Sequence, residues 1–350
     1  MTKRIEYIDA MRGFTMLLVV MFHVEWTFGG SDYGYNSFIE VFRMPLFFFI
    51  SGWVFYKTDR LWDITSVKNV LQKKFAVQIV PTAIFLLSFL YMFRSITVDC
   101  FGSDKTGYWF TFVLFEYFVV YVLTEKLLNK RNLAKGEVWV GAVMLVISIL
   151  SFCYAKYYVQ YATELGPWKS ILGFLSFVKF RYLIFFWLGT IVKRFFSVFI
   201  KFTHNKYVMS GMILLFFVIA LFPHVSFLLG EYFIFVALGF AGICVVFAFF
   251  RAHETLFSRD RVLGRVSQFV GRRTLDIYLL HYFFLPWNLG FIGPFLKQYD
   301  NRAIDVLVML PLSVWIIAIC LLVSEILRLS PLLRHYLFGV QKSSNFLPPQ

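Results

Sequence analysis

The sequence IDAMRGFTMLLVVMFHV occupies residues 8–24 and gives the first indication of the fold. It is close to the roughly 20 apolar residues that a helix needs to cross a bilayer, so it predicts a membrane span. It also contains Asp9 and Arg12 near one end and His23 towards the other. Ionisable groups inside a span are costly and rare, and each of these three is therefore a candidate functional residue.

The spacing of Arg12 and His23 places both side chains on one face of that helix. They are 11 residues apart, which at about 100° per residue is roughly three turns, and roughly 16 Å along the axis. A groove with a cation at one end and an imidazole deep inside would suit a long ligand with an anionic end and a reactive end. A snorkelling arginine and a histidine bonded to a neighbouring helix would explain the same spacing, and the spacing alone leaves both open.

The composition predicts a polytopic membrane protein. Of 350 residues, 59% are hydrophobic and 21% aromatic, and the mean hydropathy is +0.71, whereas soluble domains are roughly 45–50% apolar. We expect the first apolar run to be a span and not a cleaved signal, because Arg12 and His23 interrupt it and no small-residue cleavage site follows. The four cysteines have no metal-ligand spacing, so we expect no metal site.

The hydropathy pattern predicts an all-α membrane domain with about ten transmembrane helices. We place them at about 8–28, 38–56, 76–94, 109–124, 138–157, 172–192, 207–223, 230–250, 274–292 and 304–326. With both termini in the cytoplasm, 25 of the 34 lysines and arginines fall on the inner side, as the positive-inside rule requires. The net charge of +14 is explained in this way and does not indicate a nucleic-acid partner. No internal repeat stands out, so we expect a single domain over residues 1–350 with its core at about 8–326.

The segment 60–75 alternates apolar and basic residues at roughly helical spacing. One interpretation is a helix that lies flat on the inner leaflet. The other is a basic rim for an anionic cosubstrate, to which Lys73 and Lys74 would belong.

The segment Ile8-Asp9-Ala10-Met11-Arg12-Gly13, followed by His23, resembles the first transmembrane helix of acyltransferase family 3. That family has an arginine, ten residues and then a histidine there. Its members are bacterial O-acetyltransferases that modify cell-surface or exported carbohydrates. The resemblance therefore implies a multi-pass protein of the bacterial plasma (inner) membrane that acts in the cell envelope.

Two further segments are similar to the family. Residues 44–52 form an aromatic run that ends in Ser51-Gly52, where small side chains favour helix packing and Ser51 is also a candidate ligand contact. Residues 271–281, GRRTLDIYLLH, are similar to the family's Gly-x-x-Ser-Leu-x-Ile-Tyr-Leu-x-His, and they add His281 to the candidate site. The arginines that the family has before Ile-x-Pro are replaced here by Lys74 and Gln78, and a lysine meets phosphate only as a point charge.

Glu116 is a candidate partner of His23. By helical rise it lies roughly 10 Å below the outer surface and His23 roughly 8 Å below it. A carboxylate bound to a histidine fixes its tautomer and stabilises the imidazolium. Glu116 could equally pair with Lys179 or Arg181.

The resemblance implies acyl transfer from a cytoplasmic acyl-CoA, most often acetyl-CoA, to a hydroxyl of a carbohydrate or glycolipid. His23 would act as the base or as a covalent acyl carrier, and the sequence leaves both routes open. The candidate catalytic residues are His23, Glu116 and His281. The candidate donor-binding residues are Arg12, Lys73, Lys74, Asp9 and Ser51.

Two other classes of protein remain open at this point. Ten spans with buried Arg12, His23, Glu116 and His281 would also suit a proton-coupled transporter. An assembly scaffold without chemistry of its own is the third, and the intact motif residues disfavour it.

Overall fold

A computed structural model describes residues 5–28, 34–57, 62–93, 98–129, 134–161, 167–221, 228–299 and 302–339. These residues form helices joined by turns, and no strand occurs among them. The prediction of an all-α protein is confirmed for this part of the chain.

The α-helices differ widely in length. The long ones are α1 (Glu6–Thr27), α2 (Gly34–Phe55), α5 (Trp109–Leu128), α6 (Ala134–Tyr161), α10 (Lys206–Leu221), α11 (Leu228–Ala252) and α15 (Arg302–Arg328). The shorter ones are α3 (Ile64–Lys74), α4 (Val80–Phe93), α7 (Pro167–Phe174), α8 (Leu183–Arg194), α9 (Phe196–His204), α12 (Val262–Arg272), α13 (Thr274–Phe284), α14 (Ile292–Tyr299) and α16 (Pro331–Phe338). A π-helical turn η1 (Phe75–Ile79) joins α3 to α4, and the 3-10 turns are η2 (Val98–Phe101), η3 (Lys105–Gly107), η4 (Phe177–Tyr182) and η5 (Trp287–Leu289).

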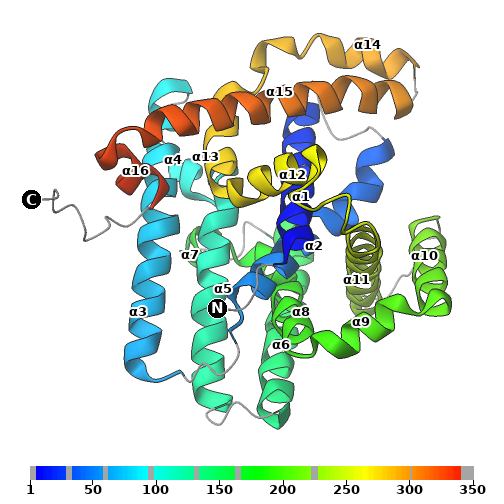
Figure 1. Ribbon diagram of the computed structural model, residues 1–350. Coiled ribbons are helices and arrows are strands. Elements are labelled where there is room, and N and C mark those ends of the chain that lie inside the picture. Colours follow the sequence, from blue (N-terminus) through cyan, green and yellow to red (C-terminus); the bar gives the residue numbers. More distant parts are fainter. Residues whose placement is uncertain are drawn as a thin grey trace, which may run out of the picture.

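The first helix is the centre of the molecule (Figure 1). It packs against α2, α11, α12, α13 and α15. Of its most apolar window 72% is buried, against 28% for the corresponding windows of α6 and α15. The outer helices therefore present apolar side chains to their surroundings, whereas α1 presents its side chains to other helices.

Glycines let α1 and α12 meet backbone to backbone. A Cβ added to Gly271 would overlap the backbone oxygen of Asp9, and one added to Gly13 would overlap the backbone oxygen of Ser267. Small residues permit such close approach between helices in membranes. This contact fixes the end of α1 that contains Asp9 and Arg12.

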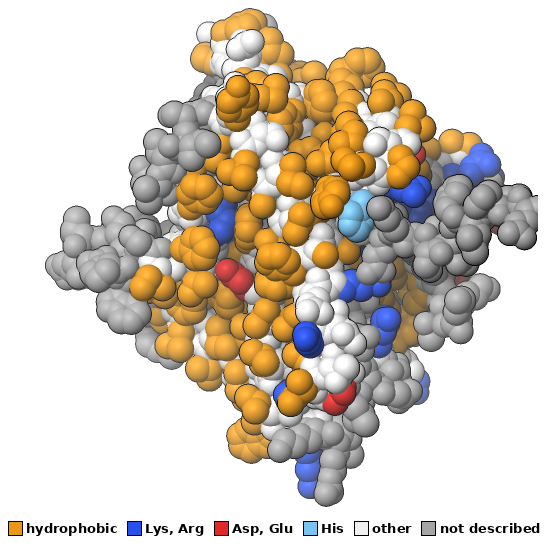
Figure 2. Space-filling model, turned by 90° about the vertical axis from the view of Figure 1, so that its left-hand side faces the viewer, with side chains coloured by type: hydrophobic (Ala, Val, Ile, Leu, Met, Phe, Trp, Pro, Cys, Tyr) orange, Lys and Arg blue, Asp and Glu red, His pale blue; other side chains and the backbone are white. Residues whose placement is uncertain are grey.

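Several helices are long and apolar enough to cross a membrane. They number five in the described residues: Glu6–Thr27, Ile64–Phe93, Lys135–Tyr157, Gly230–Ala252 and Ala303–Arg328. A sixth is possible if α8 and α9, which are bent by 97° at their junction, form one span. Figure 2 shows a face covered largely by hydrophobic side chains with few charged ones. The chain is a membrane protein by these features.

Two of the ten predicted spans are interrupted. The predicted span 172–192 is divided among α7, η4 and α8, with Ser176 in the left-handed region at φ 50° between them. The predicted span 274–292 ends as α13 at Phe284, because Pro286 follows and cannot continue a helix. The count of ten and the location of the termini stay predictions, and residues 94, 222 and 223 of the predicted spans lie outside the described residues.

The interpretation of segment 60–75 as a helix lying flat on the membrane is not supported. Residues 64–93 form one helical run of 30 residues through α3, η1 and α4, without a bend sharper than 40°. Residues 60 and 61 lie outside the described part of the chain. The π-helical turn follows directly after Lys73 and Lys74, and such turns frequently mark functional sites.

Candidate active site

The two motif histidines meet. Nε2 of His281 lies 3.3 Å from Nδ1 of His23, although 258 residues separate them in the chain. A second contact joins the same two helices, because Nη2 of Arg12 donates to Oγ1 of Thr274 at 3.0 Å. Since Arg12 and Thr274 both precede the histidines, α1 and α13 run side by side in the same direction.

The tautomer of His281 follows from its neighbours. Its Nδ1 lies 3.1 Å from the carbonyl oxygen of Ile277 and 2.8 Å from that of Tyr278. Carbonyl oxygens only accept hydrogen bonds, so Nδ1 of His281 carries the proton. In the neutral ring Nε2 then presents a lone pair towards His23.

The same argument assigns the proton of His23. Its Nδ1 lies 2.9 Å from the carbonyl oxygen of Val19 and faces the lone pair of His281, so Nδ1 carries the hydrogen. The second nitrogen, Nε2, is left as the basic atom of the pair. His281 is fully buried at 0% exposure, whereas His23 is half-buried. A ligand can therefore reach His23 and not His281.

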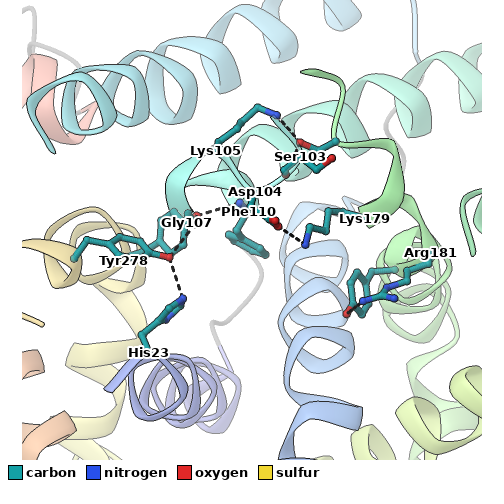
Figure 3. Close-up of polar contacts among 12 residues, drawn as sticks. His23, Ser103, Asp104, Lys105, Gly107, Phe110, Lys179, Arg181 and Tyr278 are labelled. Carbon is teal, nitrogen blue, oxygen red and sulfur yellow. Dashed lines mark hydrogen bonds and ion pairs between the residues drawn. The ribbon is translucent and has the colours of Figure 1, made fainter. Parts of the chain in front are cut away.

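Tyr282 and Gly107 complete the group around His23 (Figure 3). The Tyr282 hydroxyl lies 3.0 Å from Nε2 of His23 and 2.9 Å from the carbonyl oxygen of Gly107. The same carbonyl accepts from the Tyr278 hydroxyl at 2.9 Å. Gly107 lies in the loop before α5, and this loop reaches the histidines from another part of the chain.

Arg12 and Asp9 lie at the other end of α1. Nη1 of Arg12 is 3.9 Å from Oδ1 of Asp9, and the Arg12 side chain is 25% exposed. Asp9 is buried. The arginine thus ties α1 to α13 through Thr274 while part of its guanidinium stays accessible to a ligand.

Lys73 and Lys74 line a pocket of about 260 Å³ between the end of α2 and the α3–η1 junction. Its other lining residues are Lys57, Val54, Phe55, Val70 and Val77. The ammonium of Lys74 lies 4.2 Å from the centre of the Phe118 ring and 5.5 Å from that of Phe55. Three lysines over an apolar wall can attract an anionic group that carries an apolar arm.

Glu116 is not brought to His23. One of its carboxylate oxygens is buried without a hydrogen-bond partner, and the charge that acts on it is that of Lys105. The alternative partners are not bonded to it either, since Lys179 forms an ion pair with Asp104 at 2.6 Å and Arg181 donates to the Tyr182 hydroxyl. A catalytic role for Glu116 stays a prediction without a contact behind it.

Ser51 bonds to its own helix. Its hydroxyl donates to the carbonyl oxygen of Phe47 at 2.8 Å. A Cβ on the neighbouring Gly52 would overlap the backbone oxygen of Phe186 in α8. This geometry favours the packing role, and contact of Ser51 with a ligand stays a prediction.

Sequence reasoning did not single out Tyr282, Gly107, Arg43 or Lys57 for the site. Arg43 is buried on α2, with its guanidinium 3.9 Å from the centre of the Phe22 ring, and its charge acts on both His23 and Tyr282. The only available signal was that Tyr282 directly follows His281.

Asp276, by contrast, belongs to the packing of α13 against α15. It accepts from Arg328 at 2.7 Å and from Ser324 at 2.6 Å, and it lies 3.6 Å from Arg273.

A buried histidine pair that offers one basic nitrogen, inside a set of apolar helices, defines a membrane protein with a candidate acid–base centre. The sequence model of an acyltransferase domain matches residues 5–325, so the chain belongs to acyltransferase family 3 and has an acyltransferase role. No curated protein and no solved structure matches the chain.

Proposed function

We propose that this protein transfers an acyl group, in the first place acetyl, from acyl-CoA to a hydroxyl of a carbohydrate or glycolipid of the bacterial cell envelope. In this proposal it acts in the plasma membrane as a single domain, with the donor bound from the cytoplasmic side. The observation that carries the proposal is the contact between His23 and His281. It gives a fixed, partly accessible base inside a protein of an acyltransferase family.

The two ends of α2 support an elongated donor. Near one end Arg43 lies over Phe22, the neighbour of His23, and at the other end Val54 lines the lysine pocket. The 11 residues from Arg43 to Val54 correspond to roughly 16 Å of helix. Coenzyme A has its phosphates at one end and the thioester at the other end of a long arm, so lysines bound to phosphate would leave the thioester free to reach His23.

The chemistry assigned to His23 is general-base catalysis. Nε2 takes the proton of the acceptor hydroxyl as its oxygen attacks the thioester carbonyl carbon. The C–O bond forms and the C–S bond breaks, and the proton passes from Nε2 to the thiolate, which leaves as CoA thiol. Nδ1 keeps its proton throughout, and His281 accepts from it and stabilises the imidazolium. The buried Arg43 would stabilise negative charge on the carbonyl oxygen.

The covalent route is the less favoured of the two. An acyl-histidine requires a ring nitrogen with an open approach. Nδ1 of His23 faces Val19 and His281, and Nε2 faces the Tyr282 hydroxyl. Detection of acetyl on His23 after mixing with acetyl-CoA, with no acceptor present, would support the covalent route.

The test supplies radiolabelled acetyl-CoA to membranes that contain the protein and measures the label in the carbohydrate fraction. We expect His23→Ala to lower incorporation roughly 100-fold or more, the usual contribution of a general base, while acetyl-CoA binding is kept. His253→Ala is the matched control, because its Nδ1 also lies 2.9 Å from a carbonyl of its own helix but it is outside the pair. Equal incorporation by wild type and His23→Ala would refute the mechanism. No binding of acetyl-CoA to the wild type would refute the function and favour the transporter.

A further inference from the structure

We propose that Tyr282, held in place by Gly107, is a positioning residue that prepares His23 to receive a proton. The inference rests on the proposed function and deepens it. It starts from the line of groups that runs from the Gly107 carbonyl through Tyr282, His23 and His281 to the carbonyls of Ile277 and Tyr278.

Both ends of this line are carbonyl oxygens, which only accept. His281 must donate towards one end, which forces His23 to donate from Nδ1 to His281. At the other end the single hydrogen of Tyr282 faces two acceptors, the Gly107 carbonyl and Nε2 of His23. The neutral line is therefore one hydrogen short of satisfying every contact.

A proton taken up by His23 supplies the missing hydrogen. Nε2 then donates to the Tyr282 oxygen, and the Tyr282 hydrogen goes to the Gly107 carbonyl. The proton comes from the acceptor hydroxyl as its oxygen forms the new bond to the acyl carbon, and it leaves with the thiol. The line thus matches the charge state of the reaction and not that of the resting site, which is the arrangement that lowers a barrier.

Gly107 is required for this geometry. Its φ is +98°, and a Cβ on it would overlap the ring and hydroxyl of Tyr282. Lys105 and Thr106 before it are also left-handed, at φ 42° and 52°. Three consecutive residues in this region are unfavourable, and such conformations persist only when their surroundings impose them.

The anchor of the loop is Lys105. Its buried ammonium donates to the Phe174 carbonyl at 2.7 Å and to the Ser176 hydroxyl. The adjacent Asp104 forms its ion pair with Lys179 (Figure 3). The contacts between this loop and the segment 174–179 thereby set the position of the Gly107 carbonyl beside Tyr282.

The experiment compares Tyr282→Phe with Tyr278→Phe in the full-length purified protein. Both changes remove a hydroxyl that donates to Gly107, but only Tyr282 contacts His23; Tyr278 accepts from the Phe110 N–H at 3.0 Å instead. The probe is acetyl-CoA, with water as acceptor, and thiol release is measured. We expect Tyr282→Phe to lower kcat about 10- to 100-fold with KM for acetyl-CoA unchanged, and Tyr278→Phe to stay within about 3-fold of wild type.

A spectroscopic measurement gives a readout that does not depend on turnover. In protein with ¹⁵N-labelled histidine, the ring signals of His23 should show a protonated Nδ1 and a bare Nε2, and Tyr282→Phe should shift Nε2 more than Nδ1. Equal effects of the two Phe variants, on kcat and on the His23 signals, would overturn the inference. If the wild type releases no thiol, the proposed function fails, while the signals still test the hydrogen-bonded line.

Discussion

The histidine cluster and the lysine pocket are built from different kinds of parts. Around His23 and His281 the partners are backbone carbonyls and buried rings, whose positions the helices fix. Around Lys73 and Lys74 the charged groups are the ends of long side chains, and the wall behind them is apolar. One region is rigid around a single nitrogen, and the other offers charge over a wider area.

This difference matches what each region is proposed to do. Proton transfer depends on placement to fractions of an ångström, so fixed acceptors are of use there. Attraction of a phosphate depends on charge, which flexible ammonium groups provide over a range of positions. Changes in the first region should therefore act on kcat, and changes in the second on the affinity for the donor.

The largest effect in this comparison is expected for His281→Ala. Loss of the ring removes the acceptor of Nδ1 of His23 and opens a cavity beside it, because His281 is fully buried. We expect kcat to fall roughly 100-fold while the Kd for acetyl-CoA stays within about 3-fold, by loss of a transition-state contact alone. Titration calorimetry and thiol release measure the two quantities. A change in Kd as large as the change in kcat would show that the two regions are not separate.

The double variant Lys73→Met, Lys74→Met should have an intermediate effect of the opposite kind. We expect the KM for acetyl-CoA to rise about 10-fold, which is about 1.4 kcal/mol, with kcat unchanged and a larger effect at low salt. Acetyl-pantetheine, which has the thioester arm without the nucleotide phosphates, is the matched control donor. The lysine changes should leave its KM unaltered, and an equal rise for both donors would refute phosphate binding in this pocket.

The smallest effect concerns the loop that carries Gly107. Burial lowers the pKa of Lys105 from its usual 10.5 to about 8, against the raising effect of Glu116. Between these pH values the folded protein has a neutral Lys105 and the unfolded chain a charged one, so the unfolded chain binds more protons and stability rises with pH. Lys105→Met should flatten this rise by a few degrees of Tm. Thermal unfolding in detergent at several pH values from about 8 to 10 measures it, and parallel profiles would contradict the assignment.

The sequence predicted the elements of the site better than their contacts. The motifs identified His23 and His281, and helical spacing placed Arg12 and His23 on one face of α1. Depth along a helix was the only basis for pairing Glu116 with His23, and depth does not determine the direction of a side chain around the helix axis. Glu116 lies instead within the influence of Lys105.

The remaining differences come from long-range packing. Gly107 reaches His23 only because the loop before α5 folds onto α13, and no local pattern signals this contact. The spans were predicted from average hydropathy, which does not detect the interruption at Ser176 or the stop before Pro286. Arg43 was counted as a loop charge, since its burial on α2 depends on the helices around it.

The parallel contact of α1 with α13 also has a consequence for biosynthesis. The ribosome completes His281 258 residues after His23, which at about 5–20 residues per second takes roughly 13 to 52 s. During that interval α1 is in the membrane with its histidine and arginine but without Thr274, His281 or Tyr282. Every nascent or truncated chain that ends before α13 is therefore catalytically inert, and the first helix to be inserted depends on protection by the insertion machinery until one of the last arrives.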